Sequence, residues 1–190
     1  LPICAILGIA ANISNLYHTW EYQKETMRGK SELVKENSAN QTSTGLDRDY
    51  ITQWSYGISE TWTLLVPNTK GGASNINMLE SPQAQERADP MYAQVYQQMG
   101  QYWGNQPGTS GPVYVGAFVL LLFVLGLFIV KGSIKWALLG ATILSILLSW
   151  GRNFMGLTDF FIDYVPMYAK FRTVASILVI AEFTIPLLAM

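Results

Sequence analysis

Residues 112–150 constrain the fold of this chain more than any other stretch, because they hold two apolar runs joined by a short connection containing Lys131 and Lys135. Residues 113–130 carry no charge and come close to the roughly 20 residues that a helix needs to cross a bilayer. Residues 134–150 are just long enough to return. Both runs are apolar on every face, whereas a surface helix of a soluble protein is apolar on one side. We therefore expect a transmembrane helical hairpin; the alternative is a buried hairpin in a soluble protein.

Composition supports the membrane class and excludes several kinds of site. Half of the 190 residues are apolar and 13% are charged, against roughly a quarter charged in soluble proteins. A net charge of −1 gives no indication of a nucleic-acid partner. The single cysteine excludes a disulfide framework and a multi-cysteine metal site, and the single histidine argues against a histidine-based metal site. Gly71-Gly72 lacks the Gly-Lys-Ser/Thr ending of a phosphate-binding loop. We expect an all-α, polytopic membrane protein with no metal and no cofactor.

The chain divides into five segments by composition. We expect a truncated transmembrane helix at residues 1–16, followed at residues 17–111 by an extracytoplasmic region of short helices and loops with a flexible connector (38–45). The hairpin occupies residues 112–150. A membrane-proximal outer loop with a short interfacial helix at residues 157–164 follows at residues 151–171, and a second truncated transmembrane helix at residues 172–190. The apolar ends indicate an internal piece of a larger polytopic protein, whose remaining part is then its partner.

The long polar region is predicted to contain short helices and turns rather than a sheet, because alternating apolar runs are short and rare in it. Asp47 can cap a helix that continues to Ile58. Asp89, followed by a proline, can begin another short helix that ends at Gly100. Residues 67–72, rich in proline, asparagine and glycine, form a turn-rich loop.

Charge alone leaves the orientation in the membrane open. Lys131 and Lys135 favour the cytoplasmic side for the connection of the hairpin. The loop at the other end of the hairpin carries Arg152, Lys170 and Arg172 near helix ends. Because both ends are basic, the positive-inside rule does not choose between them.

Five blocks of the sequence resemble the YfhO-like bacterial membrane proteins, in particular the long Bacteroidetes-type members, and together they extend over most of the chain. The blocks are Asp49-Tyr-Ile-Thr-Gln-Trp-Ser-Tyr-Gly, Glu60-Thr-Trp-Thr-Leu-Leu-Val-Pro-Asn-Thr-Lys-Gly-Gly, Ser110-Gly-Pro-Val-Tyr-Val-Gly, Leu148-Ser-Trp-Gly-Arg-Asn-Phe and Asp163-Tyr-Val-Pro-Met-Tyr-Ala-Lys-Phe-Arg-Thr-Val-Ala-Ser.

The resemblance implies a GT-C-type membrane glycosyltransferase of the bacterial cytoplasmic (inner) membrane. Such proteins take a sugar from a polyprenyl-phosphate carrier and transfer it to a cell-envelope polymer or lipid on the outer face. This placement puts residues 17–111 and 151–171 outside and residues 131–135 inside. The catalytic acidic residue of GT-C enzymes is expected in the first extracytoplasmic loop, N-terminal to this stretch. No catalytic residue is therefore assigned here, and the sugar and acceptor are not identified.

Three groups of residues are candidates for binding. Arg152, Lys170 and Arg172 can bind the phosphate of the carrier, because arginine offers a bidentate fork and lysine a point charge. The alternative is contact with lipid headgroups or pairing with Asp159 and Asp163.

Trp54 and Trp62 are the candidates for sugar contact within an outer region that is unusually rich in aromatic residues. The region also holds Tyr50, Tyr56, Tyr92, Tyr96, Tyr102 and Trp103. The alternative is that these aromatic side chains form the small core of the region and its contact surface with the lipid interface.

Glu182 lies within the last apolar run, where an ionisable side chain usually faces a bundle interior or a wet cavity. It can serve function or hydrogen-bond a neighbouring helix. Together with Pro186 it also suggests a broken span of a transport path. The alternative function is therefore a non-catalytic polytopic protein, such as a lipid or polymer transporter subunit. Membrane lipids are expected partners in either case.

Overall fold

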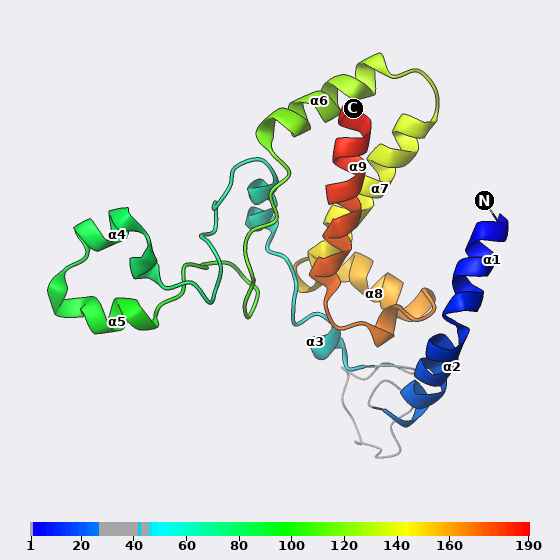
Figure 1. Ribbon diagram of the computed structural model, residues 1–190, viewed down its shortest axis with the longest axis horizontal. Helices are drawn as coiled ribbons and strands as arrows, with labels where there is room; N and C mark the ends of the chain where they lie inside the picture. The colour runs from blue at the N-terminus through cyan, green and yellow to red at the C-terminus, as the bar shows by residue number, and fades with distance from the viewer. Residues whose placement is uncertain (1, 27–41, 43–45) are drawn as a thin grey trace. The chain divides into compact units, whose positions relative to one another are not determined.

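The computed structural model describes residues 2–26, 42 and 46–190 (Figure 1). Its described residues form helices and loops without a strand, apart from two isolated bridges that join Gly71 to Tyr102 and Asn77 to Gly100. The predicted all-α class is confirmed. The connector predicted at residues 38–45 lies outside the described residues except for Thr42.

The chain forms two compact units, and each is described by itself. The first contains residues 1–51 and 160–172, and the second contains residues 52–159 and 173–190.

In the first unit, the segment predicted as one helix over residues 1–16 consists of α1 (Pro2–Ala11) and α2 (Ile13–Tyr22), followed by the 3-10 helix η1 (Gln23–Glu25). Asn12 separates α1 from α2, and its side-chain amide donates to the Gly8 carbonyl at 3.0 Å. Asparagine favours such local bonds over continued helix.

The first unit also contains α3 (Arg48–Ile51) and η6 (Tyr168–Lys170). The Leu46 N–H donates to the Ala169 carbonyl at 3.0 Å, and Arg48 pairs with Asp163 at 2.7 Å. These long-range bonds fasten α3 to the segment near residue 170.

The prediction of a helix from Asp47 to Ile58 is wrong beyond Ile51. The Ile51 N–H still donates to the Asp47 carbonyl at 2.9 Å, but α3 then ends. In the second unit, the Tyr56 N–H donates instead to the Ser149 carbonyl at 2.8 Å. The backbone N–H of Tyr56 thus has a distant acceptor in place of the carbonyl four residues earlier that a continued helix would supply. The spacing of hydrophobic residues does not reveal such a distant acceptor.

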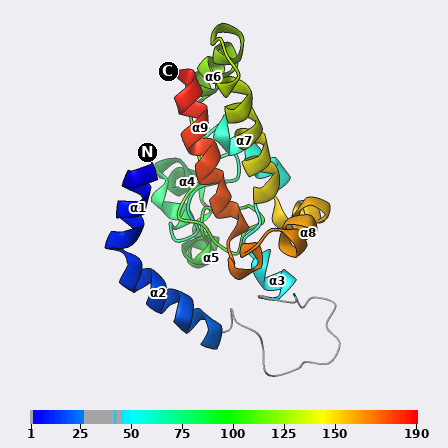
Figure 2. The same cartoon turned by 90° about the vertical axis from the view of Figure 1, so that its right-hand side faces the viewer.

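Three helices form the centre of the second unit, and these are α6 (Ala117–Ile129), α7 (Ile134–Ser149) and α9 (Val179–Ala189). α9 continues from the 3-10 helix η7 (Val174–Leu178) and packs against both α6 and α7, as Figures 1 and 2 show from two sides. Their shared core contains Phe123, Leu178, Ala181, Ile185 and Leu188.

Small and hydroxyl-bearing residues allow these helices to pack closely. A Cβ atom on Gly126 of α6 would lie 2.5 Å from the Leu188 carbonyl oxygen, so only glycine fits without movement. The hydroxyl groups of buried Thr142 and Thr184 lie 2.7 Å apart and form a hydrogen bond between α7 and α9. Such small-residue and hydroxyl contacts are typical of helix pairs in membranes.

The apolar helices are shorter than the predicted spans. α6 begins at Ala117 rather than near residue 113, because the N–H groups of Val115 and Gly116 point to the Leu64 carbonyl at 3.4 and 3.3 Å. Among the described residues, no single helix combines the length and apolar composition that crossing a membrane requires. One pair, Ile134–Ser149 with Gly151–Tyr164, meets that requirement together but is bent by 109°.

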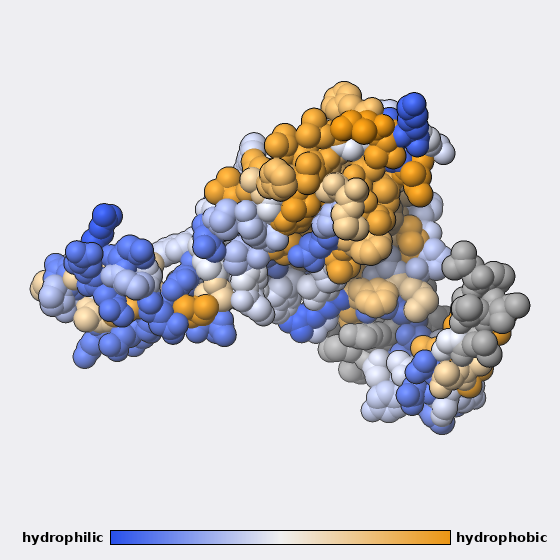
Figure 3. All heavy atoms as spheres, turned by 45° about the horizontal axis from the view of Figure 1, so that its top comes forward, coloured by the Kyte–Doolittle hydropathy of each residue, from blue (hydrophilic) through white to orange (hydrophobic). Residues whose placement is uncertain are grey.

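The outer surface of these helices is strongly apolar. Phe118 and Phe128 of α6 are 70% and 81% exposed, and Phe183 of α9 is 67% exposed. Figure 3 shows hydrophobic side chains gathered over this part of the surface.

The polar part of the second unit contains η2 (Ile58–Leu64), η3 (Met78–Glu80), α4 (Pro82–Arg87), η4 (Pro90–Tyr92) and α5 (Ala93–Gln98). The predicted cap at Asp89 is confirmed, because its carboxylate accepts from the Met91 N–H at 2.9 Å. The predicted turns at residues 67–72 are also present. After α7, the 3-10 helix η5 (Gly151–Phe154) leads into α8 (Met155–Tyr164). The short helix expected at residues 157–164 is therefore present, and it begins two residues earlier than expected.

Candidate functional site

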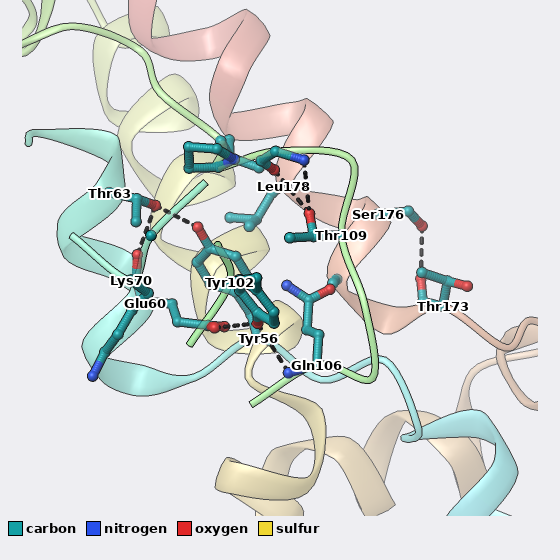
Figure 4. A pocket seen from close by; sticks show the side chains of 15 residues that line it. Tyr56, Glu60, Thr63, Lys70, Tyr102, Gln106, Thr109, Thr173, Ser176 and Leu178 are labelled. Carbon is teal, nitrogen blue, oxygen red and sulfur yellow. Dashed lines mark hydrogen bonds between the residues drawn. The ribbon is translucent and has the colours of Figure 1, made fainter. Parts of the chain in front are cut away.

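A pocket of about 210 Å³ lies in the second unit, where the polar region meets the start of η7. Figure 4 shows its side chains, which come from segments far apart in the sequence. Tyr56 and Glu60 come from the first part of the polar region, Tyr102 and Gln106 from the loop after α5, and Thr173 from the turn before η7. Local folding of any one segment therefore does not form this site.

Glu60 organises the wall of the pocket. Its side chain is 2% exposed and accepts hydrogen bonds from the Gly57 N–H at 2.7 Å, the Asn105 N–H at 3.0 Å and the Tyr102 hydroxyl. A buried carboxylate is tolerated when donors surround it in this way. Glu60 thus joins η2 to the loop that follows α5.

Tyr102 stays protonated and donates to this carboxylate. Burial raises the pKa of Tyr102 well above its ordinary value, and the hydrogen bond to Glu60 raises it further. The Tyr102 oxygen also accepts from the Gln106 N–H at 3.0 Å. Its hydroxyl is therefore engaged on both sides, and the tyrosine is fixed in the pocket wall.

Tyr56 is held in a similar manner. Its hydroxyl bonds to the Thr63 hydroxyl, which lies 2.7 Å from the Glu60 carbonyl. Burial raises the pKa of Tyr56, partly offset by the bond to Thr63, and the negative charges of Glu60 and Glu182 add to the increase. Both tyrosines of the pocket are therefore neutral phenols at physiological pH.

Lys70 is the cationic residue of the pocket lining, and its backbone position is set by the 67–72 loop. Gly71 has φ +83°, and a Cβ atom there would lie 1.7 Å from the Gln101 carbonyl oxygen. The Trp103 N–H donates to the Lys70 carbonyl at 2.8 Å. In Figure 4 the Lys70 side chain extends with its ammonium group away from Tyr102.

The three basic residues predicted to bind phosphate are distributed over both units. Arg152 lies in the second unit, where its guanidinium donates to the Gln53 carbonyl at 2.6 Å and its N–H to the Ser55 hydroxyl at 2.9 Å. Lys170 and Arg172 lie in the first unit. Their convergence stays a prediction.

Arg172 contacts an aromatic residue of its own unit. Its guanidinium donates to the Tyr50 hydroxyl at 3.1 Å and lies over the Tyr50 ring, 4.8 Å from the centroid. The carboxylate of Asp163, predicted as an alternative partner for the basic residues, instead binds Arg48. Arg152 and Arg172 therefore each have a structural role, whatever else they bind.

The two tryptophans predicted to contact sugar do not line the pocket. Trp54 donates from its indole nitrogen to the Gly108 carbonyl at 3.2 Å, and Trp62 is 62% exposed on η2. Of the aromatic-rich region, Tyr56 and Tyr102 line the pocket instead.

Glu182 lies in the first turn of α9 with its side chain exposed. Its neighbours Val179 and Phe183 are also exposed. Within the described residues, Glu182 therefore lies on the apolar outer surface of the helix group and not in its core.

Glu60, Gln106 and Thr173 are pocket residues that the sequence did not single out. One local signal was available, since Glu60 follows Gly57 at the three-residue spacing by which a glutamate returns to the backbone N–H at a helix start. Its bonds to Tyr102 and Asn105 depend on the tertiary fold and had no local signal.

Comparison of the chain with protein-family models, with curated proteins and with solved structures finds no match.

Proposed function

We propose that this chain is a membrane-embedded part of a glycosyltransferase-like protein of the YfhO-like, GT-C type, which binds a polyprenyl-phosphate-linked sugar at the outer face of the bacterial cytoplasmic membrane. One observation carries the proposal: a pocket with polar groups in its walls lies at the start of η7, which continues into the apolar helix α9. An amphipathic ligand fits such a place, with its polar head in the pocket and its chain along the helices.

Exposed side chains support the membrane placement. A soluble protein seldom exposes a contiguous apolar surface as large as a helix group, yet α6, α7 and α9 expose Phe118, Phe128, Trp136 and Phe183. Buried Thr142 and Thr184 lie between the helices instead. In lipid this distribution is favourable, because apolar side chains meet acyl chains and polar ones bond between helices.

In this proposal the pocket lies on the outer side and the connection with Lys131 and Lys135 on the cytoplasmic side, which is the orientation that the resemblance implies. Arg152, Lys170 and Arg172 remain the residues that we propose for the carrier phosphate. The sugar then moves to an acceptor from the cell envelope. The catalytic acid is contributed from outside this stretch, and no described residue is assigned to it.

Binding of the donor tests the proposal. We would reconstitute the full chain in nanodiscs and measure the affinity of a fluorescent short-chain polyprenyl-phosphate-linked hexose, with phosphatidylglycerol as a lipid that also carries an anionic phosphate. We expect the donor to bind at least ten-fold more tightly than phosphatidylglycerol. Equal affinities would show that the chain recognises only anionic lipid, and the proposal would fail.

A second function, a lipid or polymer transporter subunit, is favoured by the position of Glu182. A carboxylate exposed among Val179 and Phe183 is unfavourable against acyl chains, so it suits a wet transport path. Glu182→Gln would then abolish transport of the lipid-linked substrate in vesicles while leaving donor affinity unchanged. Sugar transfer that persists when the full-length protein carries Glu182→Gln would favour the glycosyltransferase instead.

A further inference from the structure

The hydrogen-bonding groups of the pocket differ in what they still offer to a ligand. The Glu60 carboxylate is surrounded by three donors, from Gly57, Tyr102 and Asn105. The hydroxyls of Tyr102 and Tyr56 are engaged with protein groups. What the two tyrosines present to the pocket is therefore their ring surface, held rigidly in place. Rigid aromatic walls are a common feature of small-molecule sites.

Charge argues against an anionic ligand in this pocket. Glu60 lines it with a carboxylate, which repels a phosphate group. Lys70 lines it as well, but in Figure 4 its ammonium is directed away from Tyr102. The lining thus holds one carboxylate and one ammonium group, and no net positive charge attracts an anionic head group.

Two side chains at the pocket can bond hydroxyl groups of a ligand. Gln106 lines the pocket, and its primary amide has two donor hydrogens and an acceptor oxygen. Thr173 also lines the pocket, from the turn before η7. A hydroxyl group can both donate and accept.

We infer that this pocket binds the saccharide ring, and not the phosphate, of an amphipathic ligand, with the ring against Tyr102 and its hydroxyls bonded to Gln106 and Thr173. A sugar ring has an apolar face that packs on an aromatic ring and a hydroxyl rim that needs donors and acceptors. Both requirements are met by the lining described above. The inference rests on the proposed function for the identity of the ligand, and assigns the subsite within it.

The test compares two probes on the full chain in nanodiscs: a short-chain polyprenyl-phosphate-linked hexose and the bare polyprenyl phosphate of the same chain length. The saccharide subsite predicts that the hexose-linked probe binds about ten-fold more tightly than the bare carrier. Gln106→Leu keeps the backbone N–H that donates to Tyr102 and should remove most of that difference, as expected for loss of about one good hydrogen bond. Affinity for the bare carrier should stay unchanged.

Two further variants separate binding from folding. Gln98→Leu makes the same chemical change on exposed α5, away from the pocket, and should bind both probes as the wild type does. Thr173→Val removes the second proposed hydroxyl contact with little change in shape, and should also weaken only the hexose-linked probe. Circular dichroism of each variant confirms a folded chain.

The outcomes distinguish the two proposals. If both probes bind equally and Gln106→Leu and Thr173→Val have no effect, the saccharide subsite is wrong while binding of the carrier lipid stands. If neither probe binds better than phosphatidylglycerol, the proposed function fails and the subsite fails with it. A selective loss for the hexose-linked probe in both variants supports the inference.

Discussion

At the scale of single residues, Glu60 joins the two sides of the pocket wall. Its carboxylate accepts from the backbone of Gly57 in its own segment and of Asn105 in a distant one. In Glu60→Gln, an amide N–H₂ would face one of these N–H groups, so that two donors oppose each other in a buried place. We expect a loss of about 1–3 kcal/mol in the free energy of unfolding, measured by chemical denaturation in detergent.

Glu86→Gln provides the matched control. Glu86 is exposed on α4, and a surface change of this kind should alter stability by less than about 0.5 kcal/mol. Equal stability of Glu60→Gln and Glu86→Gln would show that the buried carboxylate does not hold the two segments together.

At the scale of the helices, the contact between α6 and α9 depends on the absence of a side chain at Gly126. A methyl group there would meet the Leu188 carbonyl at 2.5 Å, and the two helices would have to move apart. We expect Gly126→Ala to destabilise the chain by about 1–3 kcal/mol through overpacking, as measured by thermal unfolding followed by circular dichroism.

Gly140 on α7 allows the same substitution without a contact. No heavy atom lies within 4 Å of a Cβ atom built there. Gly140→Ala should therefore be neutral or stabilise the chain by up to about 1 kcal/mol through helix propensity. A similar effect of both substitutions would mean that helix propensity, and not close packing, decides the response at Gly126.

At the scale of the whole molecule, the proposed membrane placement makes a prediction about sidedness. We expect Gln94→Cys, on exposed α5, and Ser133→Cys, in the connection between α6 and α7, to lie on opposite sides of the membrane. In a Cys4→Ala background, an impermeant maleimide should label residue 94 in spheroplasts and residue 133 only after permeabilisation.

Labelling in detergent, where both positions are accessible, is the control for reactivity. Labelling of both cysteines from the outside would mean that α6, which lies between them in the sequence, does not cross the bilayer. The apolar outer surface of α6 and α9 would then need a protein partner in place of lipid.

Local interactions explain what the sequence by itself determined. The helical class follows from long apolar runs and the scarcity of alternating patterns. The helix start at Asp89 follows from its carboxylate, which accepts a hydrogen bond from the backbone N–H two residues ahead. The turns at residues 67–72 follow from the proline and glycine residues within them. Each depends on residues a few positions apart, so the sequence contains the full cause.

The tertiary structure alone decided where α3 ends, where α6 begins and which side chains line the pocket. Tyr56 bonds to Ser149 across the second unit, and Gly116 turns toward Leu64. Glu60 meets Tyr102 from a segment far along the chain. Long-range packing determines hydrogen-bond partners of this kind, and the spacing of hydrophobic residues does not encode it. These partners set helix ends at positions where local propensity would have continued the helix.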